Sequence, residues 1–263
     1  MPERRKKTHH HPREKKLIKL FSGTIILMII VAFVAFVFLT PILNLNTHHL
    51  YGNYTVCAND IWAASGLTAI NERTGGLRQY PNFFALSAQQ MERGILELPY
   101  IKTASVTKTF PNTVTVHVTE RTVKGYVLYQ DMMFIYIDEY GMVLEARTYM
   151  ERNLPVIVGL DIESFILGQY ISTVNPASFS AAVELTGLFT EHNLIIDRID
   201  PSNVFDIRLF VDNMEVLFGD MSNASTKLNR LYGILNSPDR IQSVRGTLDI
   251  SDLTRGHVFT PLR

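Results

Sequence analysis

Cysteine and the residue patterns of enzymes are both scarce in this sequence. Cys57 is the single cysteine among 263 residues, so no intrachain disulfide can form and packing must hold the fold together. We expect the Cys57 thiol to be buried. The sequence also has no Walker A, H-E-x-x-H, G-x-S-x-G, G-x-G-x-x-G or paired-cysteine pattern. This lack argues against an enzyme and predicts neither a cofactor nor a metal site.

Charged residues are missing from one long run, between Leu20 and Asn59. As a helix, residues 20–43 would measure about 36 Å, enough to cross a hydrocarbon core of about 30 Å. Pro41 lies where such a helix would stop. A cleaved signal peptide is the alternative, but its apolar region is usually only about 7–15 residues, and no A-x-A-like cleavage site follows. We therefore predict an uncleaved transmembrane helix over residues 20–43.

Basic residues gather immediately before this run, in a tail over residues 1–19 that we expect to be cytoplasmic. By the positive-inside rule they place the N-terminus in the cytoplasm and residues 44–263 outside it, a single-pass type II topology. Those residues hold 17 basic and 23 acidic side chains, which argues against nucleic acid as a partner. The residues that set the topology are Arg4, Arg5, Lys6, Lys7, Arg13, Lys15, Lys16 and Lys19.

The few partial matches to chemical motifs have ordinary structural explanations. Ser105 and Lys108 fit S-x-x-K, but they lie in a two-residue alternation that puts them on opposite faces of a strand. Glu120 and Arg121, at a strand end, are expected to form an ion pair or a junction hydrogen bond. Trp62 is expected in the core.

Residues 44–121 show the order β-α-α-β-β. A short extended stretch over 46–51 precedes a helix over 59–65 that ends at Gly66. After an expected exposed loop over 69–81, Ser87 and Gln90 form a capping-box pattern and open a second helix, closed by Pro99. Alternating residues then predict strands over 104–107 and 113–119, joined in an antiparallel hairpin by Phe110-Pro111-Asn112-Thr113.

Residues 122–263 read as a second, β-rich unit, so the predicted fold class is α+β. We expect strands over 127–137 and 142–146 around the turn Asp138–Gly141, and a helix over 175–192 that begins at Asn175-Pro176. A hairpin is predicted across Asp212-Asn213. A further helix over 223–236 and strands over 244–250 and 257–261 complete the unit.

Together these residues resemble the bacterial cell-division family FtsQ/DivIB. The order of tail, membrane span, POTRA domain over 44–121 and β domain over 122–263 is similar to that family. More specific runs are Leu50-Tyr51-Gly52-Asn53, Leu98-Pro99-Tyr100-Ile101, Phe110-Pro111-Asn112-Thr113-Val114 and Val118-Thr119-Glu120-Arg121. The residues of this family signature are Gly52, Pro99, Tyr100, Ile101, Val106, Pro111, Asn112, Glu120, Arg121, Asp138 and Gly141. The 69–81 loop departs from the resemblance, since it is longer than expected there.

The resemblance implies a non-enzymatic scaffold at the division septum that binds FtsL and an FtsB/DivIC-type coiled-coil protein. It also implies that the last strand of the β domain offers its edge to a partner by β-augmentation. The partner-binding residues it suggests are Leu248, Ile250, His257, Val258, Phe259 and Thr260.

Two other functions remain open at this point. One is a membrane-anchored envelope enzyme with a site that no motif marks. The other is a POTRA-type chaperone for envelope protein assembly, although such proteins usually carry several POTRA domains. A band of a fluorescent fusion at midcell would distinguish the division scaffold from both.

Overall fold

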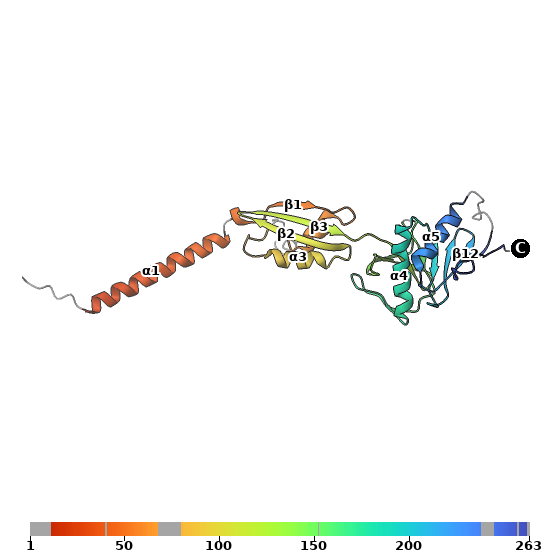
Figure 1. Cartoon of the computed structure of the whole chain (residues 1–263). Coiled ribbons are helices and arrows are strands. Elements are labelled where there is room, and N and C mark those ends of the chain that lie inside the picture. Colours follow the sequence, from red (N-terminus) through yellow and green to blue (C-terminus); the bar gives the residue numbers. More distant parts are fainter. Residues whose placement is uncertain are drawn as a thin grey trace, which may run out of the picture. The chain divides into compact units, whose positions relative to one another are not determined.

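The computed structural model describes residues 12–39, 41–67, 80–151, 153–237, 245–256 and 258–261 (Figure 1). These residues fall into two compact units. The first is drawn from Met1–Tyr51, Trp62–Gly94 and Ser105–His117, and the second from Gly52–Ile61, Ile95–Ala104 and Val118–Arg263. The expected loop over 69–81 lies almost wholly outside the described residues.

A long helix begins the described chain. Helix α1 covers Pro12–Leu39 and is followed by a short 3-10 turn, η1, over Pro41–Leu43. From Phe21 to Phe36 its large apolar side chains are mostly exposed. Over the described residues, none of the helices reaches the length and hydropathy of a membrane span. The transmembrane segment over 20–43 therefore stays a prediction.

The next elements follow the predicted β-α-α-β-β order. They are β1 (Thr47–Tyr51), α2 (Ala58–Ala64), α3 (Ala88–Leu96), β2 (Ile101–Thr109) and β3 (Thr113–Glu120). The sheet order is β1-β3-β2, and β1 runs parallel to β3. The predicted capping box is present, since Ser87 Oγ accepts the Gln90 N–H at 3.1 Å and Gln90 Oε1 accepts the Ser87 N–H at 3.0 Å.

The second unit is built around a nine-stranded mixed sheet, with the strand order β14-β13-β12-β11-β10-β7-β4-β5-β6. Its strands are β4 (Gly125–Tyr129), β5 (Met133–Ile137), β6 (Val143–Arg147), β7 (Val156–Ile157), β10 (Arg198–Asp200), β11 (Ile207–Val211), β12 (Met214–Gly219), β13 (Gly246–Asp249) and β14 (Val258–Pro261). A separate hairpin pairs β8 (Ile162–Ser164) with β9 (Ser172–Thr173).

Two helices cover one face of this sheet, α4 (Pro176–Glu191) and α5 (Ala224–Leu235) (Figure 1). Asn175 caps α4 by accepting the Ser178 N–H, and Pro176 occupies the first turn, as predicted. Phe179, Leu185 and Leu228 on the helices share one buried cluster with strand residues. On the opposite face, Tyr126, Tyr136 and Leu144 form a smaller cluster. The mixed α+β fold class is thereby confirmed, apart from the membrane span.

Two local predictions were wrong. Cys57 is exposed rather than buried, because it lies in the turn region just before α2. The strand expected over 127–137 is instead the hairpin of β4 and β5, whose turn residues Gln130 and Asp131 have φ values of 50° and 56°. By contrast, Trp62 is buried, as expected.

Candidate functional site

One edge of the nine-stranded sheet is formed by β13 and β14, the last two strands of the described chain. Strand β13 pairs in parallel with β12, and β14 pairs with β13 in antiparallel register, with Leu248 opposite Phe259. In the part of the chain that the structure describes, β14 has β13 as its sheet neighbour and ends the order. Its other side therefore presents main-chain N–H and C=O groups that a further strand can bind.

The residues predicted to bind a partner differ in their exposure. Leu248 and Ile250 are fully buried in the main core, whereas Val258 is 55% exposed and Thr260 is also exposed. Phe259 is partly buried and packs against the core cluster. Its ring lies over Gly246, where an added Cβ would come within 2.6 Å of the ring. His257 lies outside the described residues.

The first charged residue of the signature, Glu120, organises the turn before α2. Its carboxylate accepts the N–H groups of Tyr54, Thr55 and Val56 at 3.0, 2.7 and 2.9 Å. Burial acts to raise the pKa of Glu120, but the three N–H donors outweigh it, so the pKa is lowered overall. This is the junction hydrogen bond expected for Glu120.

Gly52 of the signature lies beside the same strand end. Its φ of +89° belongs to the left-handed region, and a Cβ there would lie 2.0 Å from the Val118 carbonyl oxygen. No side chain can move to relieve that contact, because the neighbouring atom is backbone. Glycine is therefore required for the strand end and the turn to approach each other.

The second charged residue, Arg121, binds the turn after β5. Its guanidinium contacts Asp138 Oδ2 at 2.7 Å, while Asp138 Oδ1 accepts the N–H groups of Tyr140 and Met142 at 2.8 and 2.9 Å. Gly141 in that turn has a φ of +81°, and an added Cβ would lie 2.7 Å from the Phe179 ring. Asp138 and Gly141 thus shape a turn that Arg121 holds by charge, as the expected ion pair.

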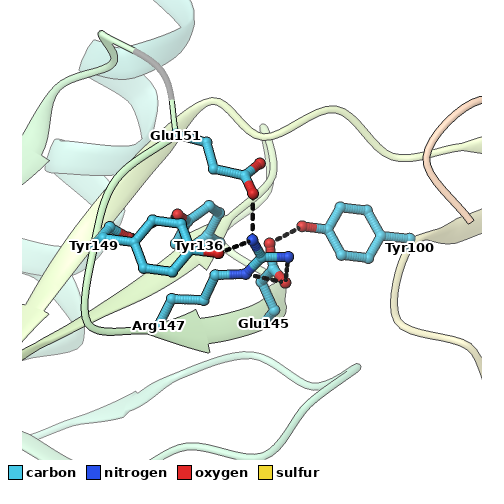
Figure 2. A network of polar contacts seen from close by, with 6 residues as sticks. All are labelled: Tyr100, Tyr136, Glu145, Arg147, Tyr149 and Glu151. Atoms are coloured by element: carbon cyan, nitrogen blue, oxygen red, sulfur yellow. Dashed lines mark hydrogen bonds and ion pairs between the residues drawn. The ribbon is translucent and has the colours of Figure 1, made fainter.

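Tyr100 belongs to a polar network at the β6 edge of the sheet, shown in Figure 2. Its hydroxyl donates to Glu145 at 2.5 Å, and Arg147 contacts the other oxygen of Glu145 at 2.7 Å as well as Tyr149 and Glu151. Burial and the bond to Glu145 raise the pKa of the Tyr100 phenol. Sequence reasoning missed this network, although Glu145 and Arg147, two apart on one strand, share a face.

A cavity of about 540 Å³ is lined by four signature residues, Gly52, Tyr100, Glu120 and Arg121, and by others that include Tyr126 and Glu151. Backbone N–H groups hold Glu120, Asp138 holds Arg121, and Glu145 holds Tyr100. These charged and phenolic groups therefore stabilise the local fold, and their geometry gives them structural roles.

The other signature residues support the first sheet. Ile101 and Val106 are buried on β2, which Pro99 precedes. Pro111 follows a cis peptide bond, and the Asn112 carbonyl accepts the N–H of Thr47 at 3.3 Å. Among the topology residues, Arg13, Lys15, Lys16 and Lys19 lie within α1, while Arg4, Arg5, Lys6 and Lys7 lie outside the described residues.

Comparison with known proteins agrees with this arrangement. The family model "POTRA domain, FtsQ-type" matches residues 49–121. The cell division protein DivIB of Clostridium acetobutylicum is 27% identical over 217 residues, 80% of each chain. Residues 49–121 are thus similar to the FtsQ-type POTRA domain, and most of the chain is similar to cell-division proteins named DivIB and FtsQ. Two more relatives cover even more of the chain. DivIB of Clostridium botulinum strain Hall is 25% identical over 91% of this chain and 88% of its own, and FtsQ of Corynebacterium glutamicum is 24% identical over 84% and 91%.

Similarity to DivIB and FtsQ proteins supports a role in cell division, because these relatives carry that role in their names. Neither family name denotes an enzyme. The expected resemblance is thus confirmed, and the matched segment contains Gly52, Glu120 and Arg121, whose contacts are described above. The partner-binding edge was not reached by the POTRA match and stays a prediction.

Proposed function

We propose that the protein is a non-enzymatic scaffold of the cell-division complex, anchored in the cell membrane by one helix and binding other division proteins outside the cytoplasm. Its partners would be FtsL and an FtsB/DivIC-type coiled-coil protein, met at the septum. The working parts would be a POTRA domain over 44–121 and a β domain over 122–263, behind the cytoplasmic tail and the span over 20–43.

Two observations support the anchor. The sequence from Leu20 to Leu43 has no charged residue, and eight basic residues precede it. Helix α1 runs through most of this segment, and its large apolar side chains between Phe21 and Phe36 are mostly exposed. Exposure of so large an apolar surface to water is unfavourable in free energy. A lipid environment would remove that surface from water.

The free edge of β14 is the single observation that carries the partner-binding part of the proposal. Exposed edge strands are open to pairing with another chain unless they are guarded by charge, bulges or cover. At β14 the exposed side chains are Val258 and Thr260, and Phe259 holds the strand onto Gly246 and the core. A partner strand would gain main-chain hydrogen bonds at this edge.

The opposite edge of the same sheet has a different chemistry. Strand β6 carries Glu145 and Arg147, which interact with each other and with Glu151, and its register with β5 shifts between Tyr136 and Ile137. Charge and irregular pairing both discourage strand addition. The contrast between the two edges favours β14 as the docking strand. Buried Leu248 holds the neighbouring strand β13 in the core, and buried Ile250 follows directly after it.

The experiment is to purify the full-length chain from membranes of dividing cells and to follow a fluorescent fusion in the same strain. The proposal expects FtsL and the FtsB/DivIC-type protein to co-purify and the fusion to form a band at midcell. Uniform fluorescence around the cell, or purification without either partner, would contradict the scaffold role.

A further inference from the structure

The end of helix α1 is fastened to the loop that precedes α3, within the first compact unit. The Asn82 amide donates to the carbonyl of Val37 at 3.0 Å, inside the last turns of α1. Two backbone hydrogen bonds continue the contact, from Phe83 N–H to the Leu43 carbonyl at 2.6 Å and from Leu45 N–H to the Pro81 carbonyl at 2.9 Å. The loop over 80–86 is therefore held where the helix ends.

The turn between β2 and β3 reaches the same end of the first sheet. Because β1 and β3 are parallel and Thr47 pairs with Thr113, both strands start at the side nearest η1. Phe110 in the turn then meets Phe83 edge to face, with ring centroids 5.8 Å apart. Lys108 binds the carbonyls of Phe83 and Leu86 and lies 4.4 Å from the centre of the Phe83 ring.

These contacts leave a group of large apolar side chains exposed beside the helix end. Ile42 is 67% exposed, Phe84 55% and Phe110 66%, whereas Phe83 is half-buried between the last two. The polar groups among them already have partners, since Asn82 and Lys108 are hydrogen-bonded to the backbone. Exposed apolar side chains thus lie on η1, on the loop before α3 and on the turn between β2 and β3.

We propose that Ile42, Phe84 and Phe110 form a membrane-contacting patch that inserts into the interfacial layer of the bilayer. The proposal rests on the membrane anchor of the proposed function. An anchored α1 holds the patch beside lipid in every copy of the chain, so the bilayer is the surface it meets at the highest effective concentration. Apolar side chains at such a surface enter the head-group boundary by about 5–10 Å. The patch would fix the orientation of the first sheet relative to the membrane surface.

The test places tryptophan in the patch of the full-length chain, reconstituted in phosphatidylcholine and phosphatidylglycerol vesicles. Phe84→Trp and Phe110→Trp each add a second tryptophan to the buried native Trp62, whose signal the wild type measures. Lipids brominated near the head-group end of the acyl chain quench tryptophan at the interface. We expect about twofold quenching of the added fluorescence, stronger than with lipids brominated near the chain terminus.

The matched control is Tyr51→Trp, in the same compact unit. Tyr51 is also half exposed, but it ends β1, about 13 Å along the strand from Thr47 at 3.3 Å per residue. Its added fluorescence should not respond to brominated lipid. Far-UV circular dichroism of each variant checks that the fold is retained.

Flotation of the vesicles after an alkaline wash separates this inference from the anchor. If the Phe84→Trp and Phe110→Trp proteins float but their added fluorescence is unquenched, the patch does not touch lipid and the inference is wrong while the anchor stands. Cross-linking of positions 84 and 110 to another protein would likewise show that the inference is wrong while the anchor stands. If the protein fails to float, the anchor and the patch are both refuted.

Discussion

The guanidinium of Arg121 lies 2.7 Å from the carboxylate of Asp138, and the two side chains are only 16% and 3% exposed. Removing one partner of such a pair leaves a buried charge without compensation. We expect Arg121→Met to lower the free energy of unfolding by about 3 kcal/mol. Urea denaturation followed by tyrosine and tryptophan fluorescence measures the loss.

The control for this prediction is Arg208→Met. Arg208 pairs with Asp206 at 3.0 Å and with Glu215 at 3.2 Å, but its side chain is 46% exposed. Exposed pairs contribute little, so its unfolding free energy should change by less than about 1 kcal/mol. Equal losses in the two variants would show that burial of the Arg121 pair is unimportant.

Glu120 makes the stability of the turn before α2 depend on pH. Its folded pKa is lowered, so its contribution is complete above the unfolded carboxyl pKa of about 4.3 and is lost as pH falls through the folded pKa. Glu120→Gln should destabilise the protein by about 1–2 kcal/mol at pH 7, because a charged acceptor of three N–H groups is lost. The difference in unfolding free energy between the variant and the wild type should narrow as pH falls below the unfolded pKa and vanish once pH is below the lowered folded pKa.

Denaturation curves at a series of pH values test this prediction. Glu184→Gln, on the exposed side of α4, removes a carboxylate away from the turn and serves as the control. If the difference in unfolding free energy between Glu120→Gln and the wild type stays unchanged in acid, the charge of Glu120 does not stabilise the turn.

Glycine is required at position 52 by both backbone conformation and space. Gly52→Ala must place a Cβ 2.0 Å from the Val118 carbonyl oxygen at a φ of +89°, so we expect a loss of at least about 2 kcal/mol. Gly187, inside α4, has no atom within 4 Å of an added Cβ. Gly187→Ala should instead stabilise the protein by about 0.5–1 kcal/mol. Thermal melts of the two variants should therefore move in opposite directions.

The free edge of β14 is best tested at Val258, because its side chain is exposed whereas Phe259 packs on the core. Val258→Pro distorts the edge and removes a main-chain donor, so binding to the isolated division partners should weaken about tenfold or more. Val258→Thr keeps the N–H and the β-branched shape, and it should bind like the wild type. Pull-down of the partners measures binding. Thermal melts of both variants check that they are equally stable. Full binding by Val258→Pro would exclude β14 as the docking strand.

Local signals in the sequence predicted the local elements well. The Ser87–Gln90 capping box, the Asn175-Pro176 helix start and the turn at Asp212-Asn213 each fix a short segment by contacts within a few residues. The prediction of a single strand over 127–137 was wrong because the turn residues Gln130 and Asp131 have positive φ values, and no glycine marks that turn in the sequence.

Long-range contacts explain what the sequence did not reveal. Strands β7 and β10 are only two and three residues long, so no periodicity marks them. They form through pairing with distant strands, β7 in parallel with β4 and β10, and β10 also antiparallel to β11. Glu120 meets Tyr54–Val56 from more than 60 residues away. The resemblance identified Glu120 and Arg121 as signature residues, but their partners needed the fold.

The connection between η1 and β1 is only Asn44–Asn46. Three extended residues reach about 11 Å at most, and hydrogen bonds to Pro81 and Phe83 already restrain this segment. In an anchored chain, the first sheet would thus stay close to the membrane surface. Proteins that reach it would have to come within roughly a nanometre of the lipid surface, which favours partners that are themselves tethered nearby over those that diffuse freely through the envelope.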